Sequence, residues 1–307
     1  MVLKKAMKVS IILPTYNRAS SFLKEAIDSV INQSYMNWEL IVIDNNSTDN
    51  TIDLVESYKS NKIFIYQINN NGVIAKSRNL GIEKSSGDYV AFLDSDDFWY
   101  KNKLQKCVDE IESGNFLIIC HAEKWLYSNG SINKTYGPKN MFQYEKMLSL
   151  GSSTVSTSAV IIKKNLLKEA GLFREDDNII TAEDYDMWLN VSKINDNIAF
   201  INQPLGAFRI HDKSESNDII FNAQSTINVL NQHFEKTNLL DPATKELAIS
   251  RVWLNAAKSL QIKGEYLSSF DAYKKANKIR FSIKIILFMA TLLIPYKFFK
   301  TLYYSIK

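Results

Sequence analysis

The chain of 307 residues is long enough for about two domains. Hydrophobic residues make up 46% and charged residues 23%, which excludes a disordered or collagen-like chain. Only two cysteines occur, Cys107 and Cys120, so a disulfide framework and a cysteine-rich zinc site are excluded, and we expect a reducing, cytosolic location. The first apolar run ends at Pro14, which is too early for a signal peptide.

The net charge of +4 is unevenly distributed along the chain. Residues 272–307 contain eight basic side chains and no acidic one, so the rest of the chain carries a net charge of −4. An asymmetry of this kind predicts that the C-terminal end faces an anionic surface.

The first 112 residues alternate short apolar runs with segments of helical spacing. Continuous apolar runs that alternate with helices indicate an α/β fold, in which helices cover a buried and mostly parallel sheet. Ligands of such sheets bind beyond the carboxyl ends of the strands, where this sequence has polar loops. The expected strands are 9–13, 39–43, 63–67 and 89–93, and the expected helices are 20–33, 51–58, 73–83 and 101–112.

The remainder of the chain has shorter strands and then turns helical beyond Asn217. One helical pair weakly resembles a tetratricopeptide unit, and we interpret it as a packing element because one unit cannot bury its own face. The expected strands are 158–163, 198–202 and 205–210, and the expected helices are 182–192, 243–263 and 266–278.

An acidic sequence, Asp-Ser-Asp-Asp, occupies residues 94–97 directly after the fourth apolar run. Three carboxylates at a strand end form an anionic spot that a bound cation would stabilise, and oxygen ligands on a loop suit Mg²⁺ or Mn²⁺. The alternative is a solvated acidic loop in front of the helix at Lys101. The loop alone favours neither interpretation.

Six motifs, taken in order, resemble those of the family 2 glycosyltransferases. Each motif alone is weak, but the ordered set is specific and covers about residues 7–215. The resemblance implies the GT-A fold, a Rossmann-like and mostly parallel central sheet with flanking helices. The motifs are Pro14-Thr15-Tyr16-Asn17-Arg18, Asp44 with its polar loop, Lys76-Ser77-Arg78-Asn79, Asp94-Ser95-Asp96-Asp97, Glu183-Asp184-Tyr185, and Arg209-Ile210-His211.

The resemblance implies how a nucleotide sugar and a metal ion are bound. Family members move a sugar from a nucleotide donor to an acceptor hydroxyl, and Mn²⁺ or Mg²⁺ stabilises the diphosphate leaving group. Asp96 would bind the ion, His211 would complete its shell, and Asp97 is a further candidate. The residues implied in donor binding are Pro14, Thr15, Asn17, Asp44, Arg78, Asp94 and Ser95.

Two of these assignments have plain alternatives. Arg78 could be an ordinary surface residue of a helix, and His211 could be an ordinary histidine of a surface loop.

A carboxylate can accept the imide N–H of uracil, so Asp44 favours a uridine donor. Thymine offers the same edge, which leaves a dTDP-sugar open.

The motif around residue 184 supplies the expected general base. An acceptor hydroxyl is a poor nucleophile, so a carboxylate must take its proton, and Asp184 matches the family's base. A single base opposite the leaving group predicts one displacement with inversion. Glu183 and Arg209 are further candidates for the site. The alternative for Glu183 and Asp184 is that acids favour the start of a helix, and both interpretations can hold together.

The C-terminal segment predicts contact with a membrane surface. Residues 285–294 are apolar apart from Thr291, which is too short to span a bilayer, and lysines and aromatic residues flank them. The alternative is a helix buried against the preceding helical pair. We therefore divide the chain into a GT-A domain at 1–215, a helical region at 216–280 and a basic amphipathic tail at 281–307.

The prediction for the whole chain is a metal-dependent inverting glycosyltransferase with a UDP-sugar donor. The tail and the family together indicate a lipid-linked saccharide acceptor, as in O-antigen and other surface polysaccharide, and a peripheral position on the cytoplasmic face of the inner membrane. No nucleic-acid partner is expected, since the basic residues lie in an apolar tail without a recognition motif. The alternatives are a sugar nucleotidyltransferase and an inactive scaffold with the same fold.

Overall fold

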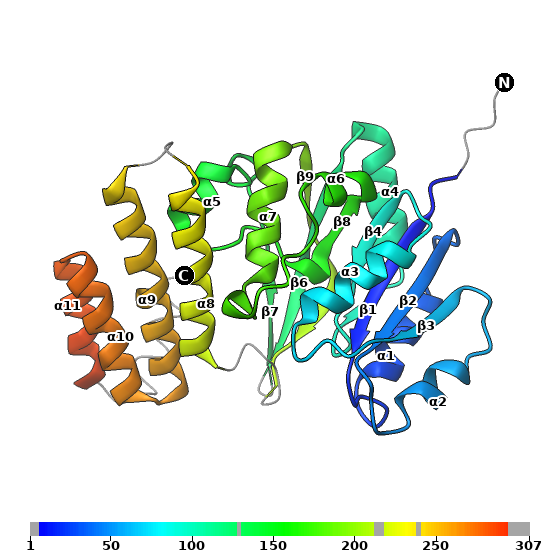
Figure 1. Ribbon diagram of the computed structural model, residues 1–307, viewed down its shortest axis with the longest axis horizontal. Coiled ribbons are helices and arrows are strands. Elements are labelled where there is room, and N and C mark those ends of the chain that lie inside the picture. The colour runs from blue at the N-terminus through cyan, green and yellow to red at the C-terminus, as the bar shows by residue number, and fades with distance from the viewer. Residues whose placement is uncertain (1–5, 128–129, 212–217, 238–240, 294–307) are drawn as a thin grey trace. The chain divides into compact units, whose positions relative to one another are not determined.

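The computed structural model describes residues 6–127, 130–211, 218–237 and 241–293 (Figure 1). The chain divides into two compact units. The first unit runs to Gln143 and also contains 154–177 and 186–214, whereas the second contains 144–153, 178–185 and the chain from Glu215 onward. The short segments 144–153 and 178–185 therefore group with the C-terminal helices, which differs from the boundary at residue 215 expected from the sequence.

Four parallel strands form one half of the sheet in the first unit, in the order β3-β2-β1-β4. Every residue of the two central strands, β1 and β2, is buried, which is why these strands are continuous apolar runs in the sequence. The strands are β1 (Val9–Thr15), β2 (Trp38–Asp44), β3 (Ile63–Gln67) and β4 (Tyr89–Phe92), and the helices that follow them are α1 (Leu23–Ile31), α2 (Thr51–Glu56), α3 (Ile74–Lys84) and α4 (Lys103–Gly114).

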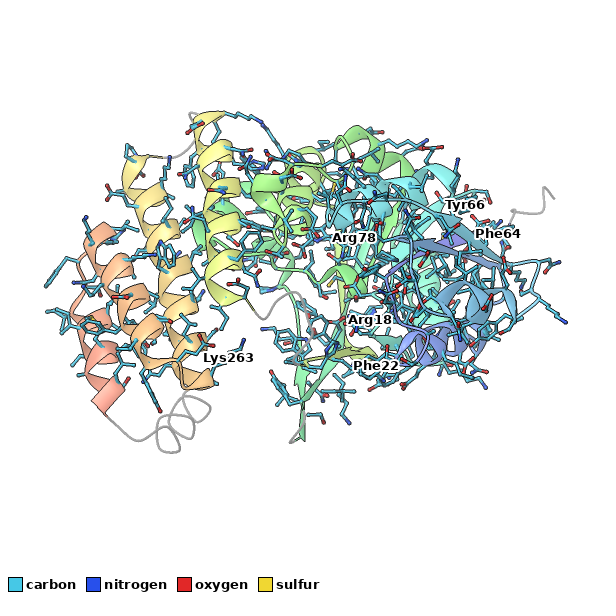
Figure 2. The ribbon with its side chains drawn as sticks, turned by 60° about the horizontal axis from the view of Figure 1, so that its bottom comes forward. Arg18, Phe22, Phe64, Tyr66, Arg78 and Lys263 are labelled. Atoms are coloured by element: carbon cyan, nitrogen blue, oxygen red, sulfur yellow. The ribbon has the colours of Figure 1, made fainter. Side chains whose placement is uncertain are left out.

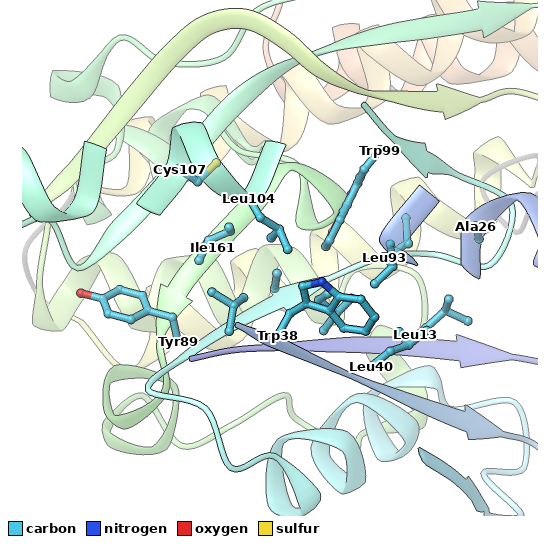
Figure 3. Close-up of a cluster of buried hydrophobic side chains, with 14 of the residues drawn as sticks. Leu13, Ala26, Trp38, Leu40, Tyr89, Leu93, Trp99, Leu104, Cys107 and Ile161 are labelled. Atoms are coloured by element: carbon cyan, nitrogen blue, oxygen red, sulfur yellow. The ribbon is translucent and has the colours of Figure 1, made fainter. Parts of the chain in front are cut away.

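The core of this unit lies between the sheet and helices α1 and α4 (Figure 3). Helix α1 contributes Leu23, Ala26, Ile27 and Val30, whose spacing of three and four residues places them on one face. They pack with strand residues such as Leu40 and with the indole of a tryptophan from the β5 strand. This packing fixes the carboxyl ends of the strands, from which the polar loops emerge.

The other half of the sheet is mixed. Strand β8 is antiparallel to both β4 and β6, and β6 is parallel to β9. The expected strands 198–202 and 205–210 are one strand, β9, whose register with β6 is irregular near Ala122. The sequence predicted no strand at β6 or β7. These elements are β5 (Phe98–Trp99), β6 (Ile118–Tyr127), β7 (Gly130–Lys134), η1 (Lys139–Met141), η2 (Thr157–Ala159), β8 (Val160–Lys163), α6 (Lys164–Glu169) and β9 (Ile198–Arg209).

Helices form the second unit as far as the structure describes it. Helix α9 packs against α8 and α10, and α11 packs against α10 (Figure 1). Aspartate side chains cap α8 and α9, and α9 ends at Gly264 with a φ of +83°, a conformation that favours glycine. The helices are α5 (Tyr144–Leu150), α8 (Ile219–Glu235), α9 (Pro242–Lys263), α10 (Tyr266–Ile279), α11 (Ile283–Ala290) and η5 (Thr291–Leu293).

Two elements contain a boundary between the units. Helix α7 (Glu183–Ile194) has its first three residues in the second unit and the rest in the first, and η3 (Asp177–Ile179) also straddles a boundary. Among the residues described, no helix is both long enough and apolar enough to span a bilayer.

A buried carboxylate near the start of β2 stabilises the first unit in a pH-dependent way. Glu39 accepts hydrogen bonds from Lys8 Nζ at 2.7 Å, and from Ser10 Oγ and the Ser86 backbone N–H at 2.6 Å each. Burial alone would raise the pKa of Glu39, but these hydrogen bonds outweigh it and lower the pKa to about 2.

We expect Glu39→Gln to lower the free energy of unfolding at pH 7 by up to ~3 kcal/mol, given 1.36 kcal/mol per pKa unit. The depressed pKa means that this stabilisation is complete above the unfolded value of 4.5 and is lost as the pH falls toward 2. Urea unfolding at pH 7 and pH 3 measures the difference in the free energy of unfolding between wild type and variant. A difference that is equally large at both pH values would contradict the assignment.

Candidate active site

The candidate donor site lies at the carboxyl ends of β1, β2 and β4, where the polar loops of the first unit emerge. The parallel register places Thr15 at the end of β1 opposite Asp44 at the end of β2. The basic residues near these ends come from the loop after β1, which carries Arg18, and from α3, which carries Arg78 (Figure 2).

Asp44 is fully buried and organises the loop after β2. Its carboxylate accepts hydrogen bonds from the backbone N–H of Ser47 at 3.0 Å and from the Ser47 hydroxyl at 2.5 Å. The backbone N–H of Asn17 donates to the same hydroxyl at 2.8 Å, and the Asn17 side chain accepts from the Thr48 N–H at 2.8 Å. These contacts join the loops after β1 and β2 into one wall. The buried Thr15 hydroxyl has no hydrogen-bond partner within the described chain.

Asp94 is held from both sides. Arg78 Nη2 lies 3.2 Å from Asp94 Oδ1, and the Ser158 hydroxyl donates to Oδ2 at 3.3 Å. Arg78 is only 5% exposed, and its guanidinium lies over the ring of Phe173 at 5.4 Å. The alternative of a surface residue is therefore wrong for Arg78. The neighbouring Ser95 is also buried, at 8% exposure.

The structure brings Asp96 and His211 together. His211 Nε2 lies 2.8 Å from Asp96 Oδ2, although 115 residues separate them, and Arg18 Nη2 lies 3.8 Å from the same oxygen. Both side chains are about one-fifth exposed, so a ligand can reach them. The His211 ring also packs against Phe22 at 5.3 Å, which fixes its orientation.

A divalent ion fits this pair as a site with few protein ligands. In the parts of the chain that the structure describes, no group of three or more His, Cys, Asp or Glu side chains is arranged to hold a metal. The carboxylate suits Mn²⁺ or Mg²⁺ when phosphates and water complete the shell, and of these two ions Mn²⁺ is the one that an imidazole suits better. The pair therefore supports a metal that binds together with a diphosphate.

Asp97 differs from this pair because it is buried and hydrogen-bonded to β9. It is 1% exposed, and its Oδ1 accepts a hydrogen bond from the Arg209 backbone N–H at 2.9 Å. Burial, followed by the nearby charges of Asp94, Asp96 and Glu123, raises the pKa of Asp97 well above its ordinary value. These contacts favour a structural role for Asp97 in joining the acidic turn to β9.

Arg209 clamps the acidic turn against α1. Its Nη1 donates to the backbone carbonyl of Asp96 at 2.7 Å, and its Nη2 pairs with Glu25 Oε2 at 2.5 Å. The rings of Phe22 and Phe98 lie 4.6 and 4.7 Å from the guanidinium carbon. With two guanidinium nitrogens hydrogen-bonded and two aromatic rings near its guanidinium carbon, Arg209 holds the Asp96 backbone as a positioning residue.

We expect Arg209→Lys to weaken Mn²⁺ binding in the presence of UDP by ~10–100-fold, the usual cost of losing a group that supports a metal ligand. Lysine keeps the charge but lacks the planar fork that reaches the Asp96 carbonyl and Glu25 together. Titration calorimetry measures the affinity. Arg251→Lys, at a residue that contacts the Ser149 carbonyl in the second unit, is the matched control and should change nothing. Equal affinities for both variants would contradict the clamp.

Asp184 lies at the start of α7, in the part of that helix that belongs to the second unit. Its carboxylate accepts a hydrogen bond from the Tyr185 N–H at 2.6 Å, and the Tyr185 hydroxyl donates to the Met147 carbonyl at 2.9 Å. Of the acids in and directly after this motif, Glu183 and Asp186 are buried, whereas Asp184 is partly exposed. Asp184 is therefore the acid of the motif that solvent reaches.

Sequence reasoning missed several residues that support the site. Glu25, Phe22 and Phe98 hold Arg209, and Ser158 holds Asp94. They contact their partners across at least 64 positions of sequence, so no local pattern could indicate them. Arg18 could have been predicted from the sequence, since it ends the first motif in a polar loop.

The sheet and the polar wall at its strand ends agree with the glycosyltransferase fold expected from the sequence. Residues 10–171 match the family model described as glycosyl transferase family 2. The chain therefore belongs to glycosyltransferase family 2, which confirms the family and the fold predicted from its motifs.

Relatives and a solved structure agree with this assignment. The chain is 32% identical over 194 residues to an Escherichia coli protein named UDP-Glc:alpha-D-GlcNAc-diphosphoundecaprenol beta-1,3-glucosyltransferase WfgD, covering 63% of this chain and 73% of WfgD. An uncharacterized glycosyltransferase of Rickettsia bellii is 35% identical over 193 residues, which cover 61% of this chain and 27% of that protein. The chain thus matches only about a quarter of that rickettsial relative's length. Staphylococcus aureus TarS 1-349 in complex with UDP-GlcNAc has a TM-score of 0.62 at 21% identity, covering 89% of this chain and 81% of TarS, which shows a shared fold.

Proposed function

We propose that the protein is an inverting glycosyltransferase that moves a sugar from a UDP-sugar to a hydroxyl of a lipid-linked saccharide in surface polysaccharide assembly. The single observation that carries this proposal is the Asp96–His211 pair at 2.8 Å, on the same acidic turn as Asp94, which pairs with the buried Arg78. WfgD is named for UDP-Glc and for a diphosphoundecaprenol acceptor, and TarS was solved with UDP-GlcNAc, which supports the donor and acceptor classes proposed here.

Donor binding is assigned to the wall formed by the loops after β1 and β2. The Thr15 hydroxyl and the backbone of Pro14 and Asn17 would line the nucleoside pocket, with the Asp44 carboxylate accepting the imide N–H of uracil. Arg78 and Asp94 would then lie between the nucleoside and the diphosphate. Ser95 would contribute its backbone on the acidic turn.

Asp96 and His211 would hold Mn²⁺ or Mg²⁺ together with the donor diphosphate. The ion, when bound, supplies positive charge that stabilises the leaving group. Arg209 and Asp97 keep the turn in place through the Asp96 carbonyl and the Arg209 N–H. Arg18 Nη2 lies 3.8 Å from Asp96 Oδ2 and adds positive charge to the same corner.

Asp184 is assigned as the general base. It would take the proton of the acceptor hydroxyl while the acceptor oxygen bonds to the anomeric carbon, and the bond from that carbon to the diphosphate oxygen would break. Attack opposite the leaving group inverts the anomeric centre. Glu183 is a second acid at the same helix start. The protein would act peripherally at the cytoplasmic face of the inner membrane, with the C-terminal segment 281–307 in contact with the membrane surface.

A donor and acceptor screen tests this proposal. UDP-Glc, UDP-Gal, UDP-GlcNAc, UDP-GalNAc and dTDP-Glc are incubated with and without Mn²⁺, and with and without a membrane lipid extract. We expect Mn²⁺-dependent transfer from one UDP-sugar to a lipid fraction, and a product of inverted anomeric configuration by NMR. Release of pyrophosphate from a sugar phosphate and UTP would instead indicate a nucleotidyltransferase.

A further inference from the structure

Helix α11 is part of the second unit and is not a free tail. Ile285 is 3% exposed, and the ring of Phe288 stacks on Tyr273 of α10 at 6.4 Å, with 6° between the planes. Gln261 of α9 also donates to the Thr291 hydroxyl at 3.1 Å. One face of α11 is therefore fixed on α9 and α10, so the described part of the expected tail belongs to the helical unit.

The other face of α11 is apolar and open. Ile283, Ile286 and Leu287 are 69%, 43% and 63% exposed, and Phe281 just before the helix is 71% exposed. Residues three and four apart lie on one side of a helix, so Ile283, Ile286 and Leu287 form a continuous strip. A strip of large exposed apolar residues marks a contact surface. We call Phe281, Ile283, Ile286 and Leu287 the α11 face.

Cations are the sequence neighbours of the α11 face, and acids are absent from that stretch of sequence. Arg280 and Lys284 flank its first two residues, and the described stretch 272–293 contains five basic residues and no acidic one. A second copy of this chain would bring the same cations opposite one another, which costs stability. An apolar strip bordered by cations complements the boundary between anionic headgroups and acyl chains.

We propose that the α11 face docks on an anionic lipid bilayer, with its apolar side chains entering the boundary region and Arg280 and Lys284 contacting lipid phosphates. The helical unit would then be a rigid membrane-docking module, in place of a flexible anchor. This deepens the proposed function, on which it rests for the lipid-linked acceptor. The docking itself is measured without any sugar transfer.

Vesicle co-sedimentation of the full chain tests the proposal. We expect binding to vesicles of phosphatidylcholine and phosphatidylglycerol (3:1), and a loss of at least ~10-fold in partition for Ile283→Ser/Leu287→Ser. Phe221→Ser is the matched control, because Phe221 on α8 is 43% exposed, the same fraction as Ile286. An unchanged melting temperature in both variants excludes a folding effect. Equal losses for the two variants, or none for the double variant, would overturn the docking face.

Charge and competing occupants are separated in the same assay. Arg280→Gln/Lys284→Gln, like vesicles of phosphatidylcholine alone, should lower partition ~3–30-fold, since each cation near an anionic surface contributes up to about 1 kcal/mol. A dimer in wild type that Ile283→Ser/Leu287→Ser converts to a monomer would assign the face to a second copy instead. A loss seen only in Phe298→Ser/Phe299→Ser would assign docking to residues beyond 293.

The outcome for docking is independent of the outcome for catalysis. UDP and Mn²⁺ binding is measured by calorimetry on the same proteins without lipid. Vesicle binding without any donor binding would contradict the proposed function and leave the docking face standing. Donor-dependent transfer by a protein that ignores anionic vesicles would do the reverse.

Discussion

Asp184→Asn is expected to lower the turnover of sugar transfer by ~10²–10⁴-fold, the usual contribution of a general base, with the affinity for the donor nearly unchanged. Asparagine keeps the size of the side chain and an oxygen that can accept the Tyr185 N–H at the start of α7. It cannot take a proton. The loss should therefore appear in kcat, measured with a saturating UDP-sugar and a lipid acceptor.

Neighbouring acids provide the controls for this variant. Asp186 is 2% exposed and pairs with Arg174 at 2.8 Å. Asp186→Asn should therefore lower the melting temperature of the protein and have a smaller effect on its turnover than Asp184→Asn. Glu183→Gln removes a buried carboxylate from the same helix start. If Glu183→Gln abolished turnover while Asp184→Asn stayed within a few-fold of wild type, the base would be Glu183.

The sequence was a good guide to the parallel half of the sheet and a poor one to the mixed half. Strands β1, β2 and β4 are buried apolar runs and β3 is a partly exposed one, and each of the four lies within two residues of its expected position. Strand β6 was missed because His121 and Glu123 interrupt its apolar pattern. Both are buried, at 0% and 2% exposure. Burial raises the pKa of Glu123, which also accepts a hydrogen bond from Tyr136 at 2.5 Å. Buried polar side chains thus interrupt the apolar run and conceal the strand.

The candidate site divides in the same way. Asp44, Arg78, Asp94 and Asp96 could be indicated because each belongs to a local sequence motif: Asp44 ends β2, Arg78 lies in α3, and Asp94 and Asp96 follow β4. Their supporting contacts could not, since the clamp on Asp96 depends on Arg209 in β9, 113 residues away. Motifs thus indicate the candidate groups for the chemistry, whereas the contact that holds the Asp96 backbone comes from a distant strand of the mixed half of the sheet.

Asp96→Ala is expected to abolish the Mn²⁺-dependent part of UDP binding and, with it, transfer. The substitution should leave the backbone of the acidic turn in place, because Arg209 donates to the backbone carbonyl of residue 96, which alanine retains. Among the described residues, the substitution removes the carboxylate contacts to His211 and Arg18. The melting temperature without metal should therefore stay close to that of wild type, which separates loss of a ligand from loss of the fold.

Calorimetric titration of UDP with and without Mn²⁺ measures this effect, and His211→Ala provides the second half of the argument. If the two side chains share one ion, each variant alone should remove most of the metal effect, and the double variant should lose little more, because partners in one site are not additive. Asp109→Ala, an exposed acid on α4, is the control and should bind as wild type does. Mn²⁺-dependent UDP affinity that survives in Asp96→Ala would remove Asp96 from the metal site and leave the Asp96–His211 pair a structural contact.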